Sequence, residues 1–377
     1  MSAPGAAAAT MAGSPAPSIA RGTVHVLFAC DLASTIDLDR AALLVDGPAE
    51  RGAFRERRTP SHLRIEPPPL RFEVAVRPVA LRGIETRALA EVTLFDFGGA
   101  LASFKAEFAG PLLGVVELSE AVYENPELAA AAEEVFRGIV ARFAPALVRP
   151  QAHFPLEDYA VFQVAAFETP IAPEDLLRDH GATIAAILRA EPGALSAQEI
   201  AEALGQSISY RPDDMLVVDW NAAFALDDDF ESVEALLGVA NVELAELRLL
   251  DRLLDDLLEG TYERLPRRTF RDRIGLGRVR QELSRLAALQ MDAALLFEQV
   301  DNAVKLFGDE YLARVYRLTA RRLHVPDWSV SVRRKLETLD RIYSVGSDEQ
   351  AARRIELLEW IIILLIAWEV LSALLWK

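Results

Sequence analysis

The feature that most constrains this chain is an apolar stretch near its C-terminal end, from Ile361 to Leu375, with a single charged residue, Glu369. Trp360 and Trp376 flank the stretch. A helix between these tryptophans would rise roughly 24 Å, at about 1.5 Å per residue, which is close to the apolar thickness of a bilayer. Tryptophan is also enriched at membrane interfaces. The stretch therefore predicts one C-terminal transmembrane helix, as in a tail-anchored protein.

The acidic residue within this stretch suggests a role in assembly. Glu369 lies nearly midway between the flanking tryptophans, where a carboxylate costs about 2.5–3.5 kcal/mol. Glu359 precedes it on the same helix and would lie about 80° around the axis. We expect both acids to face a partner helix in an oligomer, with Trp360, Trp368 and Trp376 anchoring the span. An alternative is that the helix lies shallowly, with both acids among the lipid headgroups.

The composition is typical of a globular protein. With 377 residues, of which 51% are apolar and 26% are charged, the chain should hold two or three structural units. Its formal net charge of −17 argues against direct nucleic-acid binding, because gripping phosphates requires clustered Lys and Arg. The single cysteine, Cys30, cannot form an intramolecular disulfide or a cysteine-based zinc site, which favours a reducing compartment.

Four regions follow from changes along the chain. Residues 1–21 lack both the apolar core of a secretion signal and the arginines of a transit peptide, so we expect a disordered leader. Residues 22–230 predict an α+β domain, residues 231–346 a helical bundle, and residues 347–377 a helix that runs into the anchor. The predicted fold class is therefore α+β: a strand-rich N-terminal domain, a long-helix bundle and a C-terminal transmembrane helix.

The spacing of the apolar residues predicts where the strands and helices of the first domain lie. The run from Glu91 to Phe108 surrounds the pair Gly98-Gly99 and predicts a hairpin. Ser196 and Glu199 form a capping box at a helix start. The predicted strands are residues 24–30, 41–45, 72–76, 159–167, 215–220 and 222–226, and the predicted helices are residues 112–123, 126–143, 173–188 and 196–204.

Long helices with apolar residues at three and four spacing begin at about Ser232. Similar stripes recur in residues 278–307 and 331–343, so each helix requires a neighbour, as in a bundle or coiled coil. No Gly or Pro separates the helix predicted from Ser347 from the membrane stretch. The first stripe consists of Leu236, Ala240, Leu244, Leu247, Leu250, Leu254 and Leu257.

No motif in the sequence indicates catalysis, a cofactor or a metal. The five histidines lie far apart and none has a His or Cys neighbour at ligand spacing. A speculative anion site combines a basic connector with a glycine-containing helix start, where backbone N–H groups would meet a phosphate. The simpler interpretation is a solvated loop and a flexible helix start, since Arg280 breaks the dinucleotide fingerprint. The site residues would be Arg55, Arg57, Arg58, Gly275, Gly277 and Arg278.

The segment from Leu358 to Val370 resembles the C-terminal signature of the "required for meiotic nuclear division" family, a domain of unknown function. The resemblance includes both Glu359 and Glu369, and the order of parts agrees over residues 24–377. The run Ala201–Ser207 departs from the family pattern, because it lacks the histidine of the eukaryotic relatives.

That resemblance implies a membrane-tethered, non-enzymatic protein, whose mitochondrial members face the matrix and support translation as oligomers. Because residues 1–21 do not read as a transit peptide, the chain is expected to be a bacterial member in the cytoplasmic membrane, with its bulk on the cytoplasmic side.

Together these observations predict a membrane-tethered oligomeric scaffold that presents a cytoplasmic α+β domain, without catalysis or a cofactor. Its partners would be further copies of itself, or a protein of translation or membrane assembly. One alternative is a nucleotide- or anion-binding enzyme with a site between the N-terminal domain and the bundle. Another is a membrane tether for the translation machinery.

Overall fold

The computed structural model describes residues 17–51, 67–264, 286, 288–291, 293–294 and 310–342. The chain divides into two compact units, one comprising Met1–Leu249 and Ala294–Trp328, the other Leu250–Ala293 and Ser329–Lys377. A large sheet in the N-terminal part, followed by long helices, confirms the mixed α+β class.

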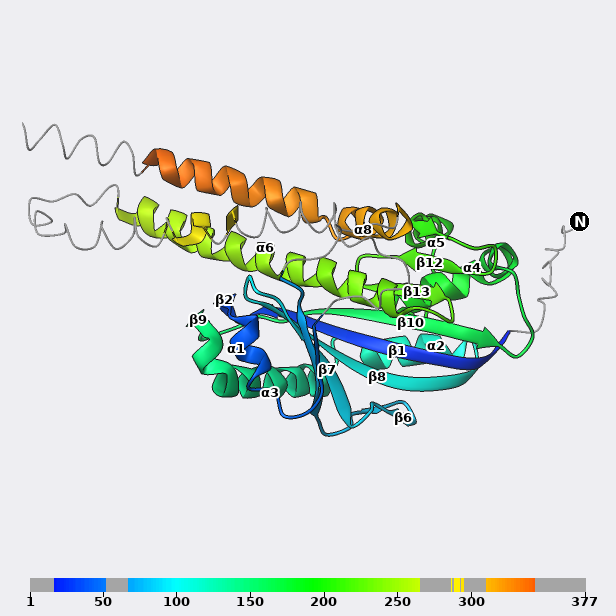
Figure 1. Ribbon diagram of the computed structural model, residues 1–377. Coiled ribbons are helices and arrows are strands. Elements are labelled where there is room, and N and C mark those ends of the chain that lie inside the picture. Colours follow the sequence, from blue (N-terminus) through cyan, green and yellow to red (C-terminus); the bar gives the residue numbers. More distant parts are fainter. Residues whose placement is uncertain are drawn as a thin grey trace, which may run out of the picture. The chain divides into compact units, whose positions relative to one another are not determined.

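The first unit is built on a mixed sheet with the strand order β11-β12-β13-β10-β1-β8-β7-β4-β3. The central strand β1 (Ser18–Asp31) pairs antiparallel with β8 (Gly99–Pro111) and with β10 (Glu157–Phe167), as Figure 1 shows. Strand β10 also pairs with β13, in parallel. The other strands of this sheet are β3 (Ala49–Arg51), β4 (Leu70–Ala75), β7 (Leu89–Leu94), β11 (Ser207–Ile208), β12 (Met215–Val218) and β13 (Ala222–Leu226). Two short ladders join β2 (Ala33–Ile36) to β9 (Leu147–Pro150) and β5 (Ala80–Leu81) to β6 (Ile84–Glu85).

The predicted hairpin is confirmed by β7 and β8, which are joined by a tight turn at Gly98. The backbone N–H of Phe95 donates to the carbonyl of Gly99 at 3.0 Å, and Gly98 N–H donates to the Phe95 carbonyl at 3.2 Å. Gly98 has a φ of +108°, and a Cβ there would lie 1.6 Å from the Ala33 carbonyl oxygen. Only glycine therefore fits this turn.

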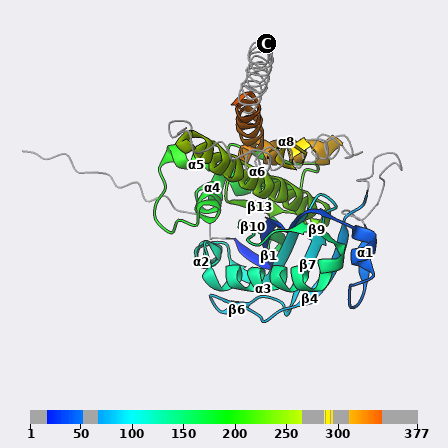
Figure 2. The ribbon, with the colours of Figure 1, turned by 90° about the vertical axis from the view of Figure 1, so that its left-hand side faces the viewer.

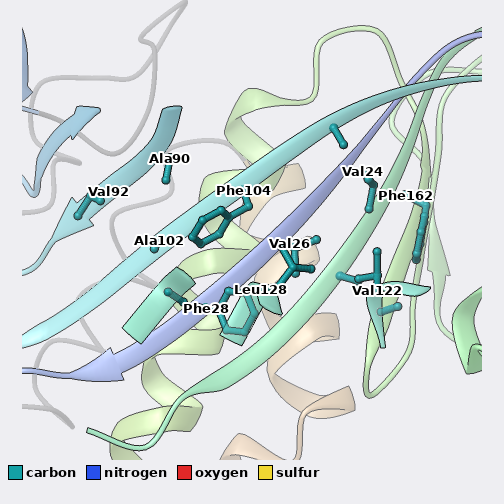
Figure 3. Close-up of a cluster of buried hydrophobic side chains, with 14 of the residues drawn as sticks. Val24, Val26, Phe28, Ala90, Val92, Ala102, Phe104, Val122, Leu128 and Phe162 are labelled. Atoms are coloured by element: carbon teal, nitrogen blue, oxygen red, sulfur yellow. The ribbon is translucent and has the colours of Figure 1, made fainter. Parts of the chain in front are cut away.

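One face of the sheet is covered by α2 (Gly114–Val122), α3 (Pro126–Phe143) and α4 (Pro173–Arg189). The N-terminal part of α6 (Glu231–Arg264) lies on the opposite side (Figure 2). Alternate strand residues point to each face. On the first face they are almost all apolar: Val26 and Phe28 of β1 pack beside Phe104 of β8 and Leu128 of α3 (Figure 3). This face is the hydrophobic core of the unit.

Helices α3 and α4 begin at Pro126 and Pro173, as the sequence predicts, whereas α2 begins at Gly114, two residues later than predicted. The side chain of Asn125 accepts hydrogen bonds from the N–H groups of Glu127 and Leu128 at the start of α3. Ser196 accepts from Glu199 N–H at the start of α5 (Ala197–Leu204), which confirms the capping box.

The strand predicted at residues 41–45 is wrong. Residues Leu38–Ala42 form a short helix, α1, because Asp37 caps it by accepting a hydrogen bond from Arg40 N–H at 3.0 Å. The apolar residues at positions 41–45 had suggested a strand, although Asp37 is a typical helix-capping residue.

The opposite face of the sheet carries the part of α6 that belongs to this unit, up to Leu249, and Figure 1 shows it passing across β10 and β1. All seven residues of the predicted α6 stripe are buried. Helix α8 (Glu310–Arg322) belongs to the same unit, and its buried face consists of Val315, Tyr316, Thr319 and Ala320. Between Asn241 and Leu247, α6 is buried on every side, so it is an interior helix of the first unit.

In the second unit, the C-terminal part of α6 packs against the helix formed by residues 325–342. Ser331 Oγ donates to Asp251 Oδ1 at 2.9 Å, and Lys335 Nζ lies 2.7 Å from the same atom. Lys335 also pairs with Asp255 at 2.6 Å. Leu254 and Leu339, one on each of these helices, are also buried.

The predicted membrane span finds no support in the described part of the chain, where no helix is both long and apolar enough to cross a bilayer. The anchor at residues 347–377, with Glu359, Trp360, Trp368, Glu369 and Trp376, lies outside the described residues. The transmembrane and tail-anchored assignments are therefore corrected, because the described helices include no candidate span.

Candidate functional site

The sheet face beneath α6 carries a cluster of polar side chains, which we call the α6 network. Its strand residues alternate with the apolar core residues described above, and therefore point away from the core. Ser103 and Lys105 of β8 lie between His25 of β1 and Glu91 of β7 in the strand order. The network comprises His25, Arg71, Glu91, Ser103, Lys105, Gln163, Glu231 and Glu234.

Glu234 of α6 is at the centre of the network and is only 8% exposed. Its Oε1 accepts a hydrogen bond from Ser103 Oγ at 2.9 Å and lies 3.0 Å from His25 Nδ1. Its Oε2 accepts from Lys105 Nζ at 3.0 Å. Both carboxylate oxygens thus face donors on the sheet, which ties α6 to the two central strands β1 and β8.

These neighbours keep Glu234 ionised despite its burial. Burial alone would raise the pKa of this carboxyl, but the charges and hydrogen bonds of His25 and Lys105 lower the pKa to about 2. For Lys105, burial opposes the charge, yet Glu234 and Glu91 raise the pKa above its usual value. The site is therefore a buried ion cluster at neutral pH.

The network continues toward the edge of the sheet through alternating charges. Lys105 Nζ lies 3.3 Å from Glu91 Oε2, and Glu91 Oε1 accepts from Arg71 Nη2 at 2.5 Å. Arg71 also reaches Glu231 of α6 at 3.4 Å. A second pair of contacts thus joins the sheet to the first turn of α6.

A small cavity of about 20 Å³ lies beside these groups, lined by Arg71, Glu91, Ser103, Glu231 and Glu234 among others. That volume is room for about one water molecule and is far too small for a nucleotide or a metabolite.

The chemistry of the network favours a structural role for these residues over a catalytic one. A carboxylate with a pKa of about 2 is a weak general base at neutral pH, and Glu234 already uses both oxygens. Ser103 donates to Glu234 and so has an acceptor that cannot readily take its proton. The arrangement suits positional control of α6.

A second buried cluster holds α8 in the first unit. Asp219, which is 0% exposed, accepts from Trp220 N–H and from Arg322 Nε, each at 2.8 Å. Arg189 Nε lies 2.8 Å from its other oxygen. Tyr159 donates its hydroxyl to the Asp219 carbonyl at 2.9 Å, and burial, with a smaller effect of Asp219, raises the pKa of this phenol well above its usual value. One carboxylate thus fixes two arginines, one of them from α8.

Helix α6 makes further buried polar contacts along its length. Asn241 Nδ2 donates to the carbonyl of Glu157 at 3.0 Å, and Tyr316 of α8 donates its hydroxyl to Glu243. Arg248 pairs with the Glu157 side chain. Successive turns of α6 therefore bind different elements of the first unit through directional contacts.

Arg55, Arg57, Arg58, Gly275, Gly277 and Arg278, the speculative anion site, are outside the described residues. Among the residues that the structure describes, no three His, Cys, Asp or Glu side chains are grouped so as to hold a metal ion.

Sequence reasoning missed the α6 network, although a signal was present. His25, Lys105 and Gln163 each interrupt an apolar strand at a position that points away from the core. A histidine, a lysine and a glutamine on one sheet face, together with the acid-rich start of α6, predict a covered polar face. The pairing across 129 to 138 residues of chain is visible only in the fold.

Comparison with known proteins matches a family model described as "Uncharacterized protein MJ0711, N-terminal domain" over residues 21–232. The chain is 23% identical over 221 residues to "Uncharacterized protein MJ0711" of Methanocaldococcus jannaschii, a match that covers 58% of this chain. It spans 66% of that relative, slightly less than two thirds of its length. No solved structure matches.

These matches correct the resemblance drawn from the C-terminal stretch. They point to the MJ0711 family and to an archaeal relative, and not to the meiotic nuclear division family or to a bacterial member of it. The earlier resemblance rested chiefly on the short apolar signature at residues 358–370, where many apolar helices look alike.

Proposed function

The chain belongs to the family described as "Uncharacterized protein MJ0711, N-terminal domain", and we propose that it is a non-catalytic scaffold that self-assembles. In this proposal the first unit is a fixed platform, and its helices present a surface to a second copy or to another protein. The family description itself names no activity.

One observation carries the proposal: the buried polar groups on α6 bind neighbouring elements of the same unit. Glu234 is held by the sheet and Glu243 by Tyr316 of α8. Buried ionic contacts add little net stability, but they specify which residues must meet. A helix whose position is fixed by specific contacts suits a scaffold, because a scaffold must keep its binding surfaces in a constant arrangement.

The second unit supports the proposal of self-assembly. Asp251, Ser331 and Lys335 fix the pairing of its described helices. Val330 on one of these helices is 66% exposed, and Met291, elsewhere in the same unit, is 63% exposed. We expect further helices, from another copy or from another protein, to pack on this unit.

The test is the mass of the purified full-length chain, measured by light scattering after size exclusion over a wide range of concentrations. A stable oligomer that persists on dilution supports the proposal. A monomer at every concentration would remove self-assembly.

A ligand screen on the same protein separates the scaffold from an enzyme. Nucleotides, sugar phosphates and divalent metals are tested by thermal unfolding, where a ligand at 100 times its dissociation constant should add about 2.7 kcal/mol. We expect no such stabilisation. A clear shift with a nucleotide would instead favour a nucleotide-binding enzyme, and co-purification with ribosomes would favour a role in translation.

A further inference from the structure

Helix α8 carries a row of three arginines on its outer face. Arg314, Arg317 and Arg321 follow one another at spacings of three and four residues, so they project from the same side of the helix. All three are exposed, and the buried residues of α8 lie on the opposite side. We call these three residues the arginine row.

The arginine row lacks acidic partners within the protein. None of its members forms an ion pair with a residue that the structure describes. Arg314 lies over the ring of Tyr311, at 6.0 Å from its centroid, and Arg317 donates to the carbonyl of Ala313 at 3.2 Å. In a chain of net charge −17, where carboxylates are in excess, these guanidinium groups can still bind an anionic group on another molecule.

Two exposed aromatic side chains lie at the two ends of α8. The ring of Tyr210, which is 65% exposed, lies 5.1 Å from that of Tyr311 at the N-terminal end. Trp220, which is 46% exposed, follows Asp219, whose carboxylate accepts from Arg322 at the C-terminal end. Tyr, Trp and Arg are enriched at protein–protein interfaces and dominate their binding energy. The outer side of α8 therefore has the composition of a protein-binding surface.

An acidic cluster lies beside the N-terminal end of α8. It consists of four carboxylates around Arg211, those of Asp213, Asp214, Asp227 and Asp228. Their oxygens lie 3.2 to 3.7 Å from the guanidinium group. One arginine cannot balance four carboxylates, so the cluster keeps an excess of negative charge. The backbone N–H of Tyr210 donates to Asp214 at 2.7 Å, which places the cluster next to the ring that contacts Tyr311.

We propose that the arginine row and the acidic cluster form a self-complementary surface through which two copies of the chain associate. The arginine row of each copy faces the acidic cluster of the other, and a two-fold axis between the copies makes both contacts at once. Tyr210 and Trp220 add apolar area to the contact. This inference rests on the proposed self-assembly and identifies the surface that carries it.

The neighbouring charges favour a second copy over other anionic partners. A nucleic acid bound to the arginine row would bring its phosphates close to the acidic cluster, whose carboxylates repel them. An anionic membrane would require an exposed apolar side on α8, but that side is buried in the first unit. A second copy instead brings carboxylates to the arginines and arginines to the carboxylates.

Charge reversal tests the contact. Arg317→Glu together with Arg321→Glu reverses the arginine row, and Asp213→Arg together with Asp228→Arg reverses the acidic cluster. When either variant pairs with itself, both contacts join like charges, so we expect its dissociation constant to rise at least about tenfold. Light scattering after size exclusion, over a dilution series of the full-length chain, measures this as a lower mass at equal concentration.

A mixture of the two variants provides the decisive measurement. In a mixed pair, the reversed row faces the reversed cluster and the two unchanged elements face each other, so both contacts again join opposite charges. We expect the wild-type mass to return in an equimolar mixture. The matched control is Arg137→Glu with Arg178→Glu, which changes the net charge equally on α3 and α4. Its mass should equal that of the wild type.

Salt tests the same contact without a mutation. Raising the ionic strength from about 0.1 M to 1 M shortens the Debye length from about 10 Å to about 3 Å, and should lower the mass of the wild type. This measurement decides the question if a reversed variant does not fold, which circular dichroism shows.

The outcomes separate this inference from the proposed function. If the wild type assembles and both reversed variants keep its mass, the α8 surface is not the contact, although self-assembly stands. A wild type that is monomeric at every concentration would overturn both. If the arginine variant lost binding to an RNA oligonucleotide while its mass stayed unchanged, the arginine row would serve a nucleic acid and the proposal would fail.

Discussion

The two faces of the central sheet are built from the same strands but are stabilised differently. On β1, Val26 and Phe28 face α2 and α3 in an apolar core (Figure 3). His25, between neighbouring core positions, faces α6 in an ion cluster. On β8, Phe104 faces the core and Lys105 faces α6. A shift of one residue along a strand therefore exchanges one kind of contact for the other.

The difference teaches what each face contributes. Apolar burial is non-directional and supplies most of the favourable free energy of folding. The α6 face adds directional contacts, each of which requires a particular donor and acceptor. The core face thus provides stability, and the α6 face determines where one helix must lie.

The largest expected effect is on the core face. Phe162 is fully buried on β10, so Phe162→Ala should lower the free energy of unfolding by about 3–5 kcal/mol through lost burial and a cavity. Chemical denaturation measures this, and the loss should be the same at about pH 5 and pH 7. A loss below about 1 kcal/mol would mean that this face is not the main source of stability.

On the α6 face, Glu234→Gln tests the central carboxylate. We expect a loss of about 1.5–3 kcal/mol at neutral pH, because charged hydrogen bonds from Lys105 and Ser103 are weakened. The pKa of Glu234 falls from 4.5 to about 2 on folding, so its contribution is present above pH 4.5 and is lost as the pH falls toward 2. The variant should lack this acid-dependent component. An unchanged acid profile would show that another carboxylate causes it.

Making the α6 face apolar should separate stability from register. The combination His25→Leu, Ser103→Ala, Lys105→Met and Glu234→Leu removes the ions together, and Glu91 keeps Arg71 as a partner. Because apolar replacement of buried ions is often neutral or better, we expect stability within about 1 kcal/mol of the wild type. Glu234→Leu alone is the matched control and should be clearly less stable.

Hydrogen exchange completes that experiment. Protection along the first turns of α6 should become weaker or uneven in the fourfold variant, since several registers become similar in energy. Wild-type protection throughout α6 would mean that packing alone fixes the helix.

The smallest effect is expected where the same strand carries an exposed charge. Glu107 of β8 pairs with Arg87 at 2.6 Å, but the two side chains are 70% and 55% exposed. Glu107→Gln should change the free energy of unfolding by less than about 1 kcal/mol. A loss as large as that of Glu234→Gln would show that burial under α6 is not what distinguishes the two carboxylates.

The sequence by itself determined the local elements. The bounds of α3, Pro126–Phe143, and the cap at Ser196 follow from Pro, Asn and Ser at helix starts, because these signals act within a few residues. The turn at Gly98 and the buried stripe of α6 were also predictable from spacing alone. Where a cap competed with an apolar run, at Asp37, the interpretation as a strand failed.

Only the tertiary structure decided the α6 network. His25, Lys105 and Gln163 look like isolated polar interruptions until β1, β8 and β10 lie side by side and Glu234 is placed over them. Burial then turns weak surface charges into a specific ion cluster, because removing water makes each unpaired charge costly. The sequence shows which residues could form ion pairs, and the fold determines which of them are buried together.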